Sequence, residues 1–94
     1  MNREEATTIL RERIERLRDL SYRELLFYRD NPSAEEVIAP SGQAYQIEVE
    51  ALWDDRPDSD LRVIAAIDDG RLRSTIMPLV QDFIIRSDGS FVGE

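Results

Sequence analysis

The stretch 45–53 reads Tyr-Gln-Ile-Glu-Val-Glu-Ala-Leu-Trp and is the strongest strand signal in the chain. Its odd-numbered positions are apolar, and its even-numbered positions are polar apart from Leu52. Successive side chains of a β-strand point to opposite faces of a sheet, so a period of two indicates a strand with one buried face. The stretch therefore predicts a strand whose odd-numbered side chains, Trp53 included, face the core.

Other strands are predicted on both sides of this one. The alternation returns in Leu61–Ile67, after a loop over Asp54–Asp60. The runs 68–70 (Asp-Asp-Gly) and 87–89 (Ser-Asp-Gly) are predicted hairpin turns, because Asp-Gly accommodates a positive φ at low cost. Pro78 marks a strand break, since proline cannot donate to a β-ladder. Further strands are predicted at Glu36–Ala39, Leu72–Met77, Val80–Arg86 and Ser90–Val92.

The N-terminal third follows the period of a helix. Over Arg3–Leu20, apolar residues recur three and four positions apart, which is typical of an amphipathic helix. Asn2 is placed to cap its first turn. Ser21 and Glu24 have the spacing of a capping box, which predicts a second short helix over about Tyr22–Arg29.

The two helical segments either continue as one helix or are separated by a kink near Leu20–Ser21. With the strands, they predict an α+β fold in a single domain over residues 1–94. Residues 1–31 are predicted to be helical, and residues 36–92 to form an antiparallel meander of about five or six strands. The helices are expected to pack on one face of that sheet.

The composition excludes several classes of chemistry. The 94 residues contain no cysteine and no histidine, and all 12 basic residues are arginine. Without thiols the chain cannot form disulfides, Cys-ligated zinc sites or iron–sulfur clusters. Without histidine and lysine it lacks the commonest general base and the Schiff-base amine. We therefore expect a protein that is not an enzyme and holds no cofactor.

The apolar runs are short. The first eight residues are polar, and the longest apolar run is residues 63–67, far below the ~20 residues that a membrane-spanning helix needs. These features predict a cytoplasmic protein without a secretory signal or membrane segment.

The net charge of −8 is unevenly distributed. Residues 1–30 hold seven Arg and seven acidic residues, so they sum to zero, whereas residues 31–94 hold five Arg and thirteen acidic residues. Such a surface repels nucleic acids and anionic membranes. If the chain has a partner, we expect another protein with a basic surface.

The densest acidic cluster consists of Asp54, Asp55, Asp58 and Asp60. Carboxylates at this spacing can bind a divalent cation, but the cluster departs from the EF-hand pattern, with Ser59 where that pattern has glycine. A solvated loop is the simpler interpretation. The turn at Asp68–Asp69 is expected at the opposite end of the sheet, so the two groups should not combine into one site.

Two other features suggest contact surfaces. Trp53 is the only tryptophan and adjoins the acidic cluster, so it is a candidate anchor for a partner if it is exposed. A strand near Val80–Arg86, if it lies at the edge of the sheet, could pair with a second copy and form a homodimer.

These observations favour a small acidic, non-enzymatic interaction or regulatory module, with an immunity or inhibitor protein as one form. Its predicted partner surface comprises Trp53, Asp54, Asp55, Asp58 and Asp60. The alternatives are a carboxylate-based domain that binds a divalent ion or small ligand, and a structural homodimer.

Overall fold

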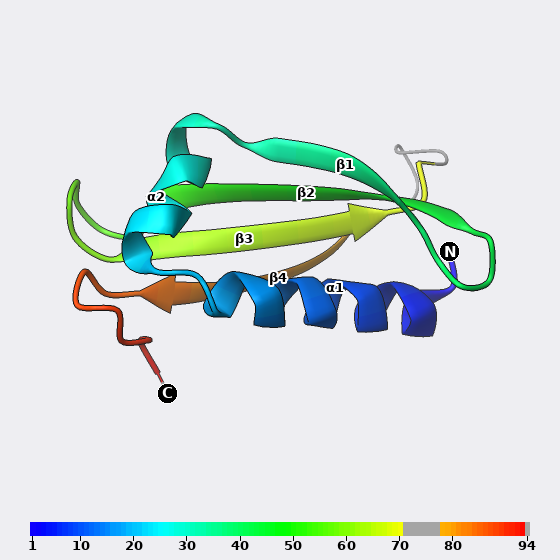
Figure 1. The fold of residues 1–94 in the computed structure, drawn as a ribbon, viewed down its shortest axis with the longest axis horizontal. Helices are drawn as coiled ribbons and strands as arrows, with labels where there is room; N and C mark the ends of the chain where they lie inside the picture. Colours follow the sequence, from blue (N-terminus) through cyan, green and yellow to red (C-terminus); the bar gives the residue numbers. More distant parts are fainter. Residues whose placement is uncertain (71–77, 94) are drawn as a thin grey trace.

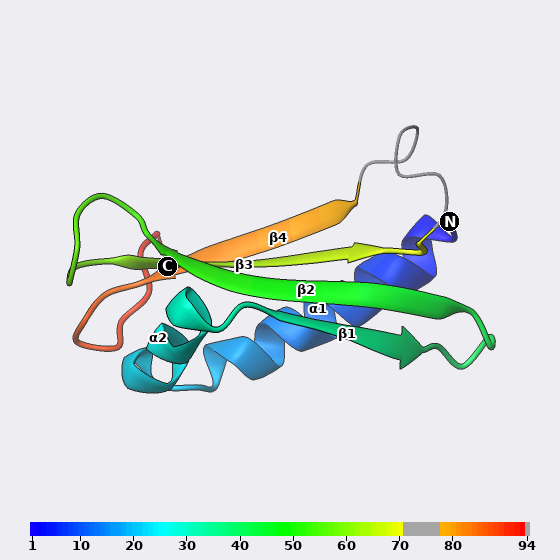
Figure 2. The ribbon, with the colours of Figure 1, turned by 90° about the horizontal axis from the view of Figure 1, so that it is seen from above.

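The computed structural model describes residues 1–70 and 78–93. The strands form one antiparallel sheet in the order β1-β2-β3-β4 (Figure 1). Both helices lie on the same side of that sheet (Figure 2). The predicted α+β architecture is confirmed. Its elements are α1 (Arg3–Arg18), α2 (Tyr22–Asp30), β1 (Ser33–Ile38), β2 (Ala44–Trp53), β3 (Leu61–Asp68) and β4 (Leu79–Ile85).

The centre of the sheet is the pair β2 and β3, which runs in register from Gln46 opposite Asp68 to Trp53 opposite Leu61. The predicted alternation is confirmed in both strands. Apart from Trp53 at the end of β2, the side chains of this pair that face the helices are at most 1% exposed; they are Tyr45, Ile47, Val49, Ala51, Leu61, Val63, Ala65 and Ile67. We call this side of the sheet the inner face.

The helices complete the core above the inner face. α1 contacts β3 and β4, whereas α2 contacts β2 and β3. The buried helical side chains are Ala6, Leu10, Ile14 and Leu17 of α1 and Leu25 of α2. Burying apolar surface of this kind contributes about 25 cal/mol per Å². The packing of these buried side chains therefore outweighs the few tenths of a kcal/mol that each surface ion pair on a helix supplies.

The predicted helix caps are present. The Asn2 side chain accepts a hydrogen bond of 3.0 Å from the Glu5 amide. At the start of α2, the Glu24 amide donates to the Ser21 hydroxyl over 3.1 Å and the Ser21 amide donates to the Glu24 carboxylate over 3.0 Å. Without these caps, the backbone amides at the N-termini of both helices would lack hydrogen-bond partners within the helix. The caps explain why the chain forms two helices, with the break between Arg18 and Tyr22.

The strand predictions need correction in number and bounds. The described residues contain four strands, fewer than the five or six predicted. β1 begins at Ser33, earlier than the predicted Glu36, because pairing with β2 extends the strand to Ser33 opposite Val49. The predicted strand Ser90–Val92 is reduced to one bridge between Ile85 and Phe91. The predicted strand Leu72–Met77 lies outside the described residues.

A polar contact joins the first turn of α1 to the sheet. Glu5 accepts hydrogen bonds of 2.8 Å from both the Tyr45 and the Ser41 hydroxyls. Tyr45 is 1% exposed, so its hydroxyl needs a partner inside the protein. Burial, with the hydrogen bond to Glu5, raises the pKa of Tyr45 to about 12.

Two leucines on opposite faces of the sheet test this packing. Leu61 is fully buried on the inner face, whereas Leu52 is 48% exposed on the opposite face. We expect Leu61→Ala to lower the free energy of unfolding by about 2–4 kcal/mol through lost packing and a residual cavity. Leu52→Ala should cost less than about 1 kcal/mol. Urea denaturation measures both, and equal losses would contradict the assignment of faces.

The Tyr45 pKa predicts a pH dependence of stability. The unfolded state loses the phenol proton near the ordinary pKa of 10.0, whereas the folded state keeps it to about pH 12. The stabilising contribution is therefore complete below about pH 10, and the free energy of unfolding should fall as the pH rises from there toward about 12. Tyr45→Phe should lessen this fall in urea denaturation series. An unchanged slope in the variant would count against the raised pKa of Tyr45 and so against burial of its hydroxyl.

Candidate functional site

The face of the sheet turned away from the helices, here called the outer face, is uncovered by any described element (Figure 2). Strand register places on it the side chains that alternate with the core residues. Its acidic members are Glu36, Glu48, Glu50, Asp68 and Asp82. Apolar side chains lie between them: Ala34, Ile38, Ala44, Leu52, Ile64, Ala66, Val80 and Ile84.

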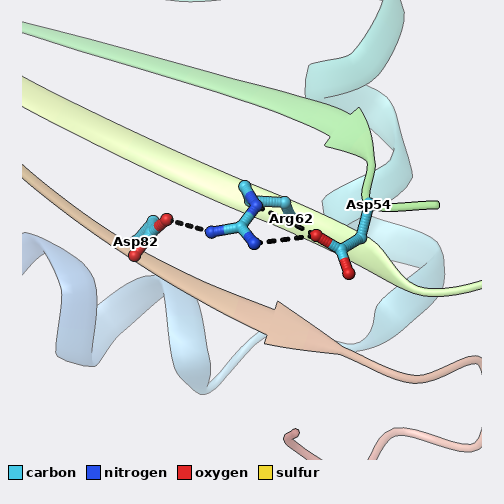
Figure 3. Close-up of polar contacts among 3 residues, drawn as sticks. All are labelled: Asp54, Arg62 and Asp82. Carbon is cyan, nitrogen blue, oxygen red and sulfur yellow. Dashed lines mark hydrogen bonds and ion pairs between the residues drawn. The ribbon is translucent and has the colours of Figure 1, made fainter.

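Arg62 is the single cationic side chain that the described strands place on the outer face. Its guanidinium donates to Asp54 Oδ1 from Nη2 at 2.8 Å and from Nε at 3.1 Å, and it also donates to Asp82 (Figure 3). These hydrogen bonds, that to Asp82 first, raise the pKa of Arg62 above its ordinary value. Arg62 is therefore neutralised from both sides and cannot offset the other carboxylates of the face.

Glu48 and Glu50 lie near the middle of the outer face. Both are exposed, and neither forms a hydrogen bond or ion pair with any other described residue. Two positions along one strand span about 7 Å, so both carboxylates can reach the same ligand. Glu48 lies between Ala34 of β1 and Ala66 of β3, two side chains too small to cover it.

A hollow of about 200 Å³ lies at this place. The alanines give it a low floor, because they stand beside longer side chains on the same face. Its outer-face lining is Ala34, Glu48, Glu50, Ile64 and Ala66, and Pro32 also lines it. Apolar floor and acidic wall together suit a ligand that has an alkyl part and a positive charge.

The predicted partner surface is divided by the structure. Trp53 lies on the helix side, partly buried against the core, with the Arg29 guanidinium carbon 4.9 Å from its ring centroid. Asp54, one position on, binds Arg62 of the outer face. The two residues therefore belong to opposite faces of the sheet.

The other residues of the predicted partner surface, Asp55, Asp58 and Asp60, lie in the loop after β2. Asp55 and Asp58 are exposed, and Asp58 adopts a φ of 62°. The Asp54 amide donates to the Asp60 carbonyl over 2.9 Å, which closes the loop. The Tyr22 hydroxyl donates to the Ser59 carbonyl over 2.5 Å and so ties the loop to α2. Burial and the carboxylates of Asp58 and Asp60 raise the pKa of Tyr22.

No metal-binding arrangement is found in the part of the chain that the structure describes. Within residues 1–70 and 78–93, no group of three or more carboxylates is placed to hold a metal ion. The acidic loop and the Asp68–Asp69 turn lie at opposite ends of β3, as predicted. Within the loop, Asp54 already serves as acceptor for Arg62.

β4 is an edge strand, as the dimer hypothesis requires. The end of that edge is occupied, however. The Val92 amide donates to the Ile84 carbonyl over 2.9 Å, and the Arg86 amide donates to the Ser90 carbonyl over 2.7 Å. Pairing with a second copy along β4 would therefore be confined to the part of that strand before Ile84.

A larger hollow, of about 440 Å³, lies beside the N-terminus of α1. Three of its polar side chains, though not the carboxylates of Glu4 and Glu12, have structural partners among the described residues. Asn2 caps the helix, Glu5 accepts from Tyr45 and Ser41, and the Thr8 hydroxyl donates to the Glu4 carbonyl. We interpret this hollow as part of the contact between α1 and the β1–β2 turn.

No family model, curated protein or solved structure matches the chain. Neither described helix is long and apolar enough to cross a membrane. Glu48 and Glu50 were not among the predicted site residues, although the alternation of residues 45–53 placed both glutamates on one side of a strand. The missing information was which side chains stand next to them on β1 and β3.

Proposed function

We propose that this chain is a small acidic, non-enzymatic protein-interaction module that binds a basic partner through the outer face. The observation that carries the proposal is the uncovered side of the sheet, where five carboxylates and apolar side chains accompany one neutralised arginine. Interfaces combine apolar contact with complementary charge in this way. The absence of cysteine, histidine and lysine from the chain supports a role without catalysis.

The distribution of charge supports a basic partner over a second copy of the same face. Two outer faces brought together would oppose five carboxylates to five, and like charges at an interface cost several kcal/mol. The helical segment has no such bias, since residues 1–30 sum to zero charge. An immunity or inhibitor protein that covers a basic surface is one form of this function, because opposite charges accelerate association.

Charge reversal on two faces tests the proposal. The double variant Glu48→Arg/Glu50→Arg should lose a protein that the wild-type chain captures from a lysate of its source organism. The control Glu12→Arg/Glu15→Arg makes the same change in net charge on the exposed side of α1 and should retain that protein. Quantitative mass spectrometry of the captured proteins, at low and high salt, gives the readout.

Capture profiles that are identical for all three proteins would refute docking on the outer face. The mass of the purified chain in sedimentation equilibrium supplies a second check. A mass of twice 10.9 kDa that falls to the monomer in a β4-edge variant would favour the homodimer instead. The variant Val80→Pro serves for this purpose, because proline on an edge strand blocks pairing without removing charge.

A further inference from the structure

The proposed function leaves open which part of a partner the outer face recognises. The hollow beside Glu48 and Glu50 narrows that choice, and the inference drawn from it rests on the proposed function. Its floor consists of Ala34 and Ala66, and Ile64 lies along one side. These three side chains offer apolar contact and no hydrogen-bonding group.

The charges at the hollow are of one sign. Glu48 and Glu50 supply two carboxylates without partners among the described residues, whereas Arg62 is held by Asp54 and Asp82. A carboxylate or phosphate would be repelled, and a purely apolar side chain would leave both glutamates unmatched. A side chain with an aliphatic stem and a cationic head satisfies both parts, because such side chains bury the stem and keep the charge at the surface.

We propose that the outer face docks a partner segment that places one arginine or lysine side chain in this hollow. The stem lies over Ala66, against Ile64, and the cationic head lies between Glu48 and Glu50. Apolar residues beside that arginine or lysine contact Ile64 and Val80, which is 55% exposed. The partner is thus a basic segment with apolar neighbours, and charge without an alkyl stem is insufficient.

The probe is a capped tripeptide, acetyl-Val-Arg-Val-amide, compared with the same peptide carrying citrulline in place of arginine. Citrulline keeps the shape of the side chain and removes its charge. In amide NMR titrations, the arginine peptide should shift signals of Ala34, Glu48–Glu50 and Ile64–Ala66, with a Kd on the order of 1 mM, about −4 kcal/mol. The citrulline peptide should bind at least about tenfold more weakly.

Variants separate the shape of the hollow from its charge. Ala66→Leu fills the floor without changing charge and should weaken binding of the arginine peptide at least about fivefold. Ala44→Leu makes the same change on the outer face away from the hollow and should leave Kd within about twofold. Glu48→Gln/Glu50→Gln should abolish binding, whereas Glu12→Gln/Glu15→Gln should not.

Shifts spread evenly over Asp55, Glu12 and the outer face would overturn the inference, as would equal binding by Ala66→Leu and Ala44→Leu. Either result would show diffuse attraction to a negative protein. The outcome of the capture experiment does not depend on the outcome of this peptide titration. If Glu48→Arg/Glu50→Arg loses its partner while Ala66→Leu binds the peptide normally, the proposed function stands and the arginine site does not.

Discussion

The structure depends on burying one side of the strand pair β2–β3. Every second side chain of the pair enters the core, and that requirement fixes register, because a slip of one residue would exchange the two faces. Ile47 opposite Ile67 and Val49 opposite Ala65 are consequences of this constraint. The helices meet this requirement with the buried apolar side chains of α1 and with Leu25 of α2. Two helices therefore suffice to cover the inner face.

The same constraint produces the outer face. A four-stranded sheet with helices on one side leaves its other side in water unless something binds there, and an antiparallel sheet tolerates this when polar residues alternate with the core. This chain places Glu48 and Glu50 at those positions, but it also places Leu52, Ile64 and Val80 there. Of these aliphatic side chains, Leu52 and Val80 are exposed and Ile64 is half-buried.

Much of the fold could be predicted from the sequence, because the deciding signals are local. The alternation in 45–53 and the capping box of Ser21 each lie within nine residues. The predicted start of β1 falls too late in the sequence because Glu35 and Glu36 obscure the alternation of the strand. Glu35 faces inward, where it pairs with Arg13 of α1. Such a contact joins residues 22 positions apart, which periodicity cannot reveal.

The candidate site was harder to predict from the sequence, because it also depends on contacts between residues far apart in the chain. The sequence drew attention to the Asp54–Asp60 loop, where carboxylates are dense along the chain. The structure pairs Asp54 with Arg62, and it brings Glu48 beside Ala34 and Ala66 from two other strands. Carboxylates that are close in the sequence need not be close on the surface of a sheet, since neighbours across strands come from distant positions.

One face of the sheet is closed by the helices, and the other is open and negatively charged. Paramagnetic relaxation by two nitroxides of equal size, one neutral and one cationic, measures both properties in one sample. The methyl groups of Ile64 and Ala66 should relax with either probe and faster with the cationic one, whereas those of Val63 and Ala65 should be protected. The amide of Arg16 on α1 should respond equally to both probes. Protection of Ile64 and Ala66, or equal relaxation of their methyl groups by the two nitroxides, would contradict an open, negatively charged outer face.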